Sequence, residues 1–462
     1  MNITVWTIFY DFAVISVLLA LSQAMRSNIT ILQRFMIPAS LIAGILGWAL
    51  GPNCLGVIPF SSVLGSYPGV LIVLIFAALP LGSKLSTVKK MGRDVGEMWN
   101  CVTLTIFSQY GWGMLFSIFA LGALWQLHPG FGYMLGTGFF GGHGTAAAVA
   151  TTFESYNWGE EARALGMASA TVGILFAIII GVVVNNIAVR KGWTHQKNAG
   201  YDKEMLTGLL APESRKPIGT ATISSSSLES LAFQFSLIMG TGLAGWYANK
   251  ILKGIWPTID APTFCMALLA GYCLQGIMEL TKTDTYIDRK TVNSLSGLCA
   301  DYLVVAGISS IKMSIVVQYA VPFTLLMVFG LSLCLFIALY LGPKLFKEYW
   351  FERSMFIYGL ATGSLVNGIL LVRMIDPELK SKSLDTYAVV GLLDRPIIVI
   401  LIALGPVFIA TGYAIPFALI CSGLAFVPLL VAKVAGWWNP GAPLVVQQHS
   451  ESQKAMPLAE TQ

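Results

Sequence analysis

Eleven stretches of this sequence are apolar over the length that a helix needs to cross a lipid bilayer. Such a helix needs about 20 apolar residues, or about 17 to 25 with tilt. Because the hydrocarbon core holds no water to bond exposed backbone groups, these segments can fold only as helices packed together. The expected spans are 4–23, 36–52, 67–82, 100–127, 164–189, 230–252, 262–280, 294–317, 319–342, 384–406 and 415–438.

Composition agrees with this fold class. Of the 462 residues, 56% are hydrophobic and 11% are charged, whereas about 25% charged residues is typical of a soluble protein. The first span is expected to be retained, because "MNITVW" has no basic amino-terminal region and no small-x-small cleavage site follows. The seven cysteines form no C-x-x-C pair, which favours core packing over disulfides or a metal site. The predicted class is an all-α polytopic membrane protein.

Basic residues are distributed unevenly over the loops between these spans. If the amino terminus is outside, 23 of the 28 lysines and arginines fall on the inner side. The positive-inside rule therefore predicts an outside amino terminus and a cytoplasmic carboxyl terminus in the cell (inner) membrane. Orientation explains the basic loops, so membrane lipids are expected as partners and nucleic acid is not.

The two halves of the chain are similar in the order and spacing of their landmarks. Pro38 is matched by Pro262 after 224 residues, and Gly141 by Gly363 after 222. A repeat with an odd number of spans inserts upside down, so five spans per half predict inverted repeats, as in many secondary transporters. The predicted domains are a first repeat (1–189), a cytoplasmic linker (190–229), a second repeat (230–408), an additional helix (409–438) and a flexible cytoplasmic tail (439–462).

Each half also contains a segment that is too polar and too rich in glycine to span the membrane. Residues 131–153 include "FFGGHGT", and residues 354–373 include "LATGSLVNG". The neighbouring spans require each segment to enter and leave on one side, outside for the first and inside for the second. We therefore predict two re-entrant hairpins that approach each other near the midplane, where irregular backbone is tolerated only if buried or lining a cavity.

Glycine-rich turns of this kind suit the binding of small ions. They leave backbone N–H and C=O groups accessible, and a helix that begins after the turn directs its positive end at an anion. Hydroxyl and amide oxygens can hold sodium without burying a full charge. The predicted substrate-binding residues are His143, Gly144, Thr145, Thr362, Ser364, Asn367, Gly368 and Arg373, and the predicted sodium-binding residues are Gly141, Gly142, Thr171, Gly363 and Asp394.

Simpler explanations exist for several of these residues. Glycines in membrane helices often serve close packing, and a lone histidine such as His143 more often completes a hydrogen bond than binds a ligand. Asp394 adjoins Arg395, so the two could neutralise each other within the span. Arg373 either holds a carboxylate with its forked guanidinium or anchors the second hairpin at the cytoplasmic face. Asp301 is expected to be structural.

The stretch "GGHGT" at 141–145, followed by "AAAVATTFE", resembles the first hairpin of the sodium/glutamate symporter family, which typically reads G-G-H-G-T-G-A-A. The likeness continues through "ARALGMASATVGILFAIIIG" and extends weakly over residues 1–410. Ala146 replaces a family glycine, and the second hairpin looks like a divergent branch. The resemblance implies sodium-driven glutamate uptake by a homodimer in which hairpin domains move against a fixed scaffold.

We therefore interpret the chain as a secondary transporter, not an enzyme, that imports glutamate with sodium by an elevator-like alternating-access mechanism. No cofactor is expected besides the coupling ion. Glutamate carries one net negative charge, so transport with one sodium is electroneutral and a second sodium makes it electrogenic. The alternatives are a sodium-coupled symporter of another di- or hydroxycarboxylate, a membrane-embedded enzyme that uses His143 in acid–base chemistry, and a channel.

Overall fold

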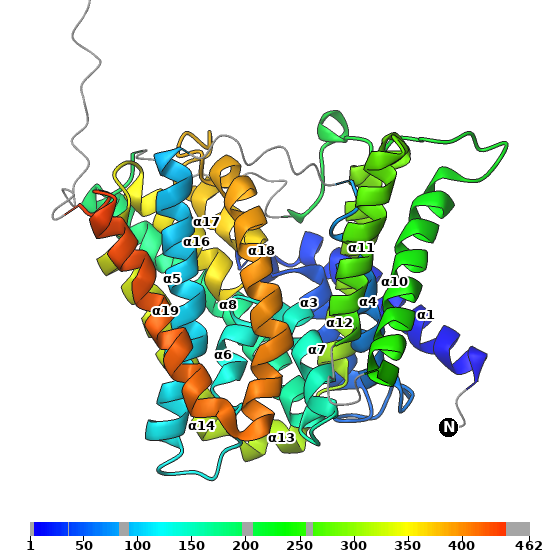
Figure 1. Ribbon diagram of the computed structural model, residues 1–462, viewed down its shortest axis with the longest axis horizontal. Helices are drawn as coiled ribbons and strands as arrows, with labels where there is room; N and C mark the ends of the chain where they lie inside the picture. Colours follow the sequence, from blue (N-terminus) through cyan, green and yellow to red (C-terminus); the bar gives the residue numbers. More distant parts are fainter. Residues whose placement is uncertain (1–3, 36, 83–91, 196–206, 256–261, 440–462) are drawn as a thin grey trace, which may run out of the picture.

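The computed structural model describes residues 4–35, 37–82, 92–195, 207–255 and 262–439. These residues form helices and connecting loops, with no strand in the described ranges. In Figure 1 the helices form two bundles side by side, with α5, α16 and α19 in one and α1, α10 and α11 in the other. The predicted all-α polytopic class is confirmed.

Each predicted span overlaps a helix, although 294–317 is divided between the helices Arg289–Ser309 and Met313–Gln318. Within the described ranges, seven helical stretches are long and apolar enough to cross a membrane: Val5–Asn28, Arg93–Leu121, Gly159–Lys191, Thr263–Leu280, Arg289–Ser309, Ala320–Leu345 and Leu393–Val434. The last stretch joins two predicted spans. Two others, Ala39–Leu50 and Leu64–Ala78, are apolar but shorter. The helix Ser230–Ile255 is long enough, but it carries Gln234 and Asn249 on its buried side.

The flanking bundle is built from the first helices of each half. Gly44 and Gly47 face Ile308 and Ser309 across the contact between two of its helices, and the missing side chains let the two backbones approach closely. Its elements are α1 (Val5–Asn28), α2 (Thr30–Arg34), α3 (Ala39–Leu50), η1 (Leu64–Ser66), α4 (Tyr67–Ala78), α10 (Ser230–Ile255), α11 (Thr263–Leu280), η5 (Asp284–Tyr286) and α12 (Arg289–Ser309).

The hairpin bundle holds the later helices of each half, and α4 and α12 of the flanking bundle pack against its α7. Its elements are α5 (Arg93–Leu115), η3 (Phe116–Leu121), α6 (Tyr133–Gly138), α7 (Gly142–Glu154), α8 (Gly159–Lys191), α13 (Met313–Gln318), α14 (Ala320–Phe336), η6 (Ile337–Leu341), α15 (Gly342–Leu345), α16 (Trp350–Thr362), α17 (Leu365–Ile375), α18 (Ser383–Phe408), η7 (Ile409–Tyr413) and α19 (Ala414–Val434). The elements η3, η6 and η7 are π-helical.

The same order of elements occurs twice along the chain. Helices α1, α3 and α4 are followed by α5, the broken pair α6–α7 and α8; helices α10, α11 and α12 are followed by α14, the broken pair α16–α17 and α18. In Figure 1 the pair α16–α17 occupies the upper half and α6–α7 the lower half. This order supports the inverted repeat, which stays a prediction together with its boundaries. The tail beyond residue 439 and part of the linker, 196–206, lie outside the described residues.

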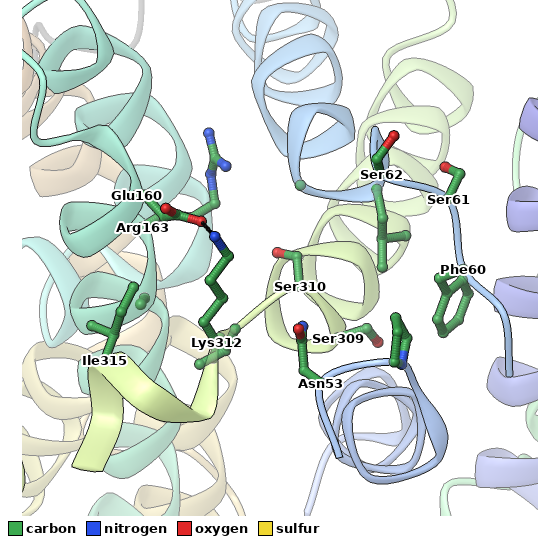
Figure 2. Close-up of a pocket in the computed structure, with 15 residues that line it drawn as sticks. Asn53, Phe60, Ser61, Ser62, Glu160, Arg163, Ser309, Ser310, Lys312 and Ile315 are labelled. Atoms are coloured by element: carbon green, nitrogen blue, oxygen red, sulfur yellow. Dashed lines mark ion pairs between the residues drawn. The ribbon is translucent and has the colours of Figure 1, made fainter. Parts of the chain in front are cut away.

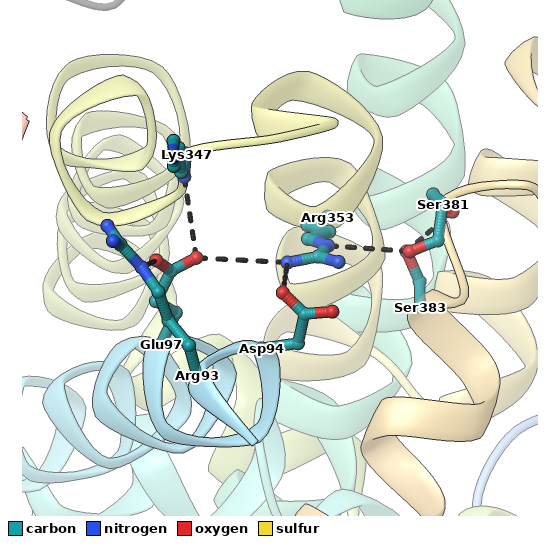
Figure 3. Close-up of polar contacts among 7 residues, drawn as sticks. All are labelled: Arg93, Asp94, Glu97, Lys347, Arg353, Ser381 and Ser383. Atoms are coloured by element: carbon teal, nitrogen blue, oxygen red, sulfur yellow. Dashed lines mark hydrogen bonds and ion pairs between the residues drawn. The ribbon is translucent and has the colours of Figure 1, made fainter. Parts of the chain in front are cut away.

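A cluster of charged side chains holds the base of α16 at the end of the bundles that carries the linker, here called the linker face. Figure 3 shows Arg353 between the carboxylates of Asp94 and Glu97 on α5, at N–O distances of 3.2 and 3.8 Å. The Arg353 and Glu97 side chains are 3% and 1% exposed. Buried charges of this kind are stable only when they are paired, so the cluster fixes α16 to α5 and positions the turn that follows.

Candidate functional site

The turns of the two broken helices meet inside the molecule. A Cβ built on Gly142 would lie 3.8 Å from the carbonyl oxygen of Gly363. Gly142 opens α7 and Gly363 follows the last residue of α16, so segments more than 200 residues apart in the sequence share one site. The sequence predicts this meeting of the hairpins, and the geometry agrees with it.

The first turn depends on the backbone freedom of glycine. Helix α6 ends at Gly138 and α7 begins at Gly142, whose φ of +65° lies in the left-handed region. The space around Gly142 would admit a side chain, since the nearest atom that an added Cβ would meet is the Gly363 oxygen at 3.8 Å. Gly141 is different, because a Cβ there would lie 2.5 Å from the carbonyl oxygen of Thr137. Backbone conformation requires glycine at 142, and crowding requires it at 141.

The second turn is held by side chains. Ser364 caps α17 by accepting a hydrogen bond from the backbone N–H of Asn367 at 3.4 Å. The Asn367 amide donates to the carbonyl oxygen of Ile174 on α8 at 3.3 Å, and Asn367 is fully buried. The turn therefore lies at Gly363–Ser364, within the predicted hairpin 354–373, because the serine acts as an N-cap while Asn367 lies within the helix.

A cavity of about 480 Å³ lies between the two turns and the flanking bundle. The turns contribute backbone and small side chains, whereas the flanking bundle contributes two residues of opposite charge. Its lining includes Gly142, His143, Gly144, Gly363 and Ser364 from the turns, and Arg26, Ser40 and Asp301 from α1, α3 and α12. This volume is in the range of binding sites for small molecules.

The electrostatics of the cavity favour an anion. Both α7 and α17 begin at its wall, and the N-terminus of a helix carries unpaired N–H groups and the positive end of the helix dipole. Arg26 adds a full positive charge from the flanking bundle, while Asp301 places a carboxylate on the same wall. The lining thus offers groups for an anion and a separate group for a cation.

His143 is held in a defined tautomer at the wall of the cavity. Its Nε2 lies 3.1 Å from the hydroxyl oxygen of Thr171, and that hydroxyl donates its proton to the carbonyl oxygen of Met167 at 2.9 Å. The Thr171 oxygen must therefore accept a hydrogen bond from Nε2–H. His143 is 4% exposed. Its Nδ1 is then the ring atom that can accept a hydrogen bond.

Asp394 is fully buried in α18, and neither of its carboxylate oxygens has a hydrogen-bond partner among the described residues. It forms no ion pair with the adjacent Arg395 in this part of the chain, so mutual neutralisation does not account for it. Pro396 follows and, lacking an N–H, leaves the carbonyl of residue 392 without its helical partner. A carboxylate and a carbonyl therefore remain available in one turn of α18.

The predicted site residues fall into three groups. Five of them line the cavity: His143, Gly144 and Ser364, predicted for substrate, and Gly142 and Gly363, predicted for sodium. Others pack behind the turns, outside the cavity lining: Gly141, Thr145, Thr362, Asn367 and Gly368. Thr171 touches His143, whereas Asp394 and Arg373 are outside the lining.

Arg373 lies in the last turn of α17. It is eight residues beyond the first residue of that helix, which corresponds to about 12 Å along the axis. The structure thus places Arg373 away from the turn that it is predicted to serve.

Sequence reasoning misses Arg26, Ser40 and Asp301 as lining residues. It assigns Arg26 to the positive-inside pattern and Asp301 to a structural role. For Asp301 the sequence does contain a signal, because a carboxylate within a predicted span marks a functional position by default. The sequence does not show that α1 and α12 lie opposite the hairpin turns.

A second pocket of about 540 Å³ lies on the face opposite the linker face. Figure 2 shows Lys312 paired with Glu160 beside this pocket. Glu160 belongs to the first turn of α8, whereas Lys312 follows α12. The ion pair therefore joins the hairpin bundle to the end of a flanking helix.

An all-helical membrane protein in which two broken helices meet at an anion-attracting cavity between two bundles has the architecture of a secondary transporter. Residues 5–351 match the family model of the sodium/glutamate symporter. The chain belongs to the sodium/glutamate symporter family, as the stretch "GGHGT" predicts.

Two relatives with the name sodium/glutamate symporter are similar to this chain. The protein from Haemophilus influenzae is 25% identical over 274 residues, which are 58% of this chain and 63% of that protein. The protein from Escherichia coli K12 is 23% identical over 331 residues, which are 70% of this chain and 76% of that protein. The match thus spans somewhat less than two thirds of the Haemophilus protein, and the turn at Gly363 lies beyond the residues that match the family model.

Proposed function

We propose that the protein imports glutamate together with sodium as a secondary active transporter in the cell membrane. The observation that carries this proposal is the cavity at which the N-termini of α7 and α17 meet, in a chain that belongs to the sodium/glutamate symporter family. Two helix N-termini stabilise a carboxylate through N–H groups that need no rearrangement when the anion arrives.

The substrate would bind between the turns. The backbone N–H groups of Gly142, Gly144 and Val366 are the proposed donors to a carboxylate, since these residues line the cavity in the first turns of α7 and α17. His143 has its Nε2–H engaged by Thr171, so its Nδ1 is the proposed acceptor for an ammonium N–H. Residues Thr145, Thr362, Asn367 and Gly368 would then shape the turns from behind.

Sodium would bind near Asp394. A buried carboxylate without a partner is stable only if it is protonated or accompanied by a cation, and a sodium symporter supplies that cation. Thr171 and the carbonyls of Gly141, Gly142 and Gly363 are the remaining proposed ligands. One sodium would neutralise the Asp394 carboxylate, so a singly negative substrate would leave the site with one net negative charge.

Movement of the hairpin bundle against the flanking bundle would give alternating access. In support, the cavity at the turns is lined by residues of both bundles near the linker face, and the second pocket lies between them on the opposite face. The pair Lys312–Glu160 would have to separate or shift as α8 moves. We propose further that the transporter is a homodimer, with its amino terminus outside and its carboxyl terminus in the cytoplasm.

Purified protein in liposomes tests the function directly. An inward sodium gradient should accumulate labelled glutamate, and replacing sodium by potassium should abolish the accumulation. Unlabelled aspartate, malate and citrate as competitors would separate glutamate transport from transport of another di- or hydroxycarboxylate. Equal uptake with and without the sodium gradient would contradict the proposal.

A further inference from the structure

The wall of the cavity opposite the turns carries two opposite charges that the proposed mechanism does not use. Arg26 lies in the last turn of α1 and Asp301 lies on α12, and both line the cavity together with His143 and Ser364. The α-amino dicarboxylates carry carboxylates and an ammonium group on one small molecule. The wall therefore presents one group for each kind of charge on such a substrate.

Both residues, Asp301 and Arg26, are positioned at the cavity wall. Asp301 is exposed and lines the cavity together with Ser40. Arg26 is half-buried and lies under Gly208 of the linker, where a Cβ would be 3.3 Å from Arg26 Nη1. Gly208 has a φ of +69°, and Gln23 donates to its carbonyl oxygen at 3.5 Å. The linker thus passes closely over the guanidinium and limits its movement away from the cavity.

We propose that Arg26 and Asp301 select α-amino dicarboxylates, with Arg26 pairing with a carboxylate and Asp301 with the ammonium group. This inference rests on the proposed function and adds two charged residues to His143, which is already proposed to accept a hydrogen bond from the ammonium group. The pairs are charge-assisted, and an unpaired ligand charge at a desolvated site is penalised, so discrimination is expected to be strong. The helix N-termini alone would accept any carboxylate.

Competition in proteoliposomes measures the discrimination. Labelled glutamate uptake is inhibited with glutamate, with glutarate, which lacks the ammonium group, and with 4-aminobutyrate, which lacks one carboxylate. In the wild-type protein, glutamate should inhibit at far lower concentration than either analogue. Asp301→Asn should weaken inhibition by glutamate about tenfold or more while that by glutarate stays the same or improves. Arg26→Gln should weaken glutamate and glutarate, which have two carboxylates, more than 4-aminobutyrate.

Control variants and a second measurement keep the outcome decisive. Asp284→Asn and Arg190→Gln remove charges away from the cavity and should leave all three inhibition constants unchanged. If a variant inserts but does not transport, sodium-dependent binding of the same three compounds in detergent replaces uptake. Equal weakening of glutamate and glutarate in Asp301→Asn would assign Asp301 a structural role and overturn the inference. Failure of the wild-type protein to take up glutamate with sodium would instead overturn the proposed function, and this inference with it.

Discussion

The two broken helices reach the same cavity, but their turns are built on different principles. At the first turn, Gly142 has a positive φ with room for a side chain, so backbone conformation is the constraint. At the second turn, Gly363 has a φ of −144° and is crowded by Asn367 and α8, so space is the constraint. Similar glycine-rich sequences in the two halves thus meet different physical requirements.

The ion pairs that anchor the two helix pairs also differ, because one is partly exposed and the other is buried. The first pair is tied to the start of α8 by Glu154 and Arg163, an ion pair in which the glutamate is 50% exposed. The second pair begins at Glu352 and Arg353, which are buried and bonded to His195 and to the carboxylates of α5. An exposed ion pair contributes little to stability, whereas breaking a buried one is costly. The second hairpin is therefore the more firmly anchored of the two.

The largest effect is expected at the conformational glycine. Gly142→Val should abolish uptake while the protein still inserts, because a β-branched residue does not adopt a positive φ. Gly142→Ala should also be impaired, by about tenfold, although the site has room for its methyl group. Gly276→Ala, at a helical position with no atom within 4 Å of the added carbon, is the control. Normal uptake by Gly142→Ala would show that the two turns do not differ in the way described.

Neither turn supplies a carboxylate, so the coupling ion is expected to depend on Asp394. Asp394→Asn should raise the sodium concentration for half-maximal uptake by about tenfold or more, because a charged ligand is lost from a buried site. The KM for glutamate at saturating sodium should change less. Asp385→Asn, an exposed position on the same helix, is the matched control. An unchanged sodium dependence would remove Asp394 from the ion site.

A rescue experiment tests crowding at the second turn. Gly363→Ala should lower uptake several-fold, since its Cβ would overlap the Asn367 amide and lie 3.2 Å from the Cα of Ile174, and overpacking of this kind forces the surroundings to shift. Combining it with Asn367→Ser should restore part of the activity by removing the overlapping atoms. No neighbouring substitution should rescue Gly142→Ala, because strain in φ has no colliding partner. Rescue at both turns would show that crowding, and not backbone conformation, is the constraint at Gly142 as well as at Gly363.

Replacing Arg373 tests whether the substrate binds at the site predicted from the sequence or in the cavity that the structure shows. If Arg373 held the substrate carboxylate, its replacement by alanine would raise the KM about tenfold. Because the residue lies two turns beyond the capped end of α17 and outside the cavity lining, we expect the KM per inserted molecule to change by less than about twofold, with any loss appearing in the amount of inserted protein. Uptake kinetics normalised to protein in the liposomes decide between the two.

The smallest effect concerns the anchor of the second hairpin. The hydrogen bond between the His195 imidazole and the Glu352 carboxylate raises the pKa of His195 above its ordinary value, although partial burial opposes the shift. A raised pKa in the folded state means that the stabilisation is fully present below the unfolded pKa and is lost as pH rises through the folded one. His195→Gln should therefore lower the melting temperature more at pH 6 than at pH 8.5. The difference between the two decreases is expected to be about one or two degrees. An equal loss at both pH values would exclude a role for the histidine's charge.

The sequence by itself determined the fold class and the place of the two turns. Bilayer physics leaves long apolar segments no alternative to helices, so each predicted span overlaps a helix, and only 294–317 is divided between two. Glycine clusters at residues too polar to span mark the breaks, and the first turn lies where "FFGGHGT" predicts it. The second turn lies within the predicted hairpin 354–373, but its position at Gly363–Ser364 depends on a serine that caps a helix, which composition does not distinguish from other small polar residues.

Only the tertiary structure decided which side chains share the cavity. Arg26 and Asp301 are separated by 275 positions, and nothing local in either segment shows that α1 and α12 lie across from the hairpin turns. Arg373 is close to the turn along the chain, but the rise of α17 carries it away from that turn. Asp394 stood out in the sequence as a charge within a span, but its isolation from Arg395 depends on how α18 packs. Periodicity and hydropathy constrain each helix by itself, whereas a binding site depends on the faces that helices turn toward one another.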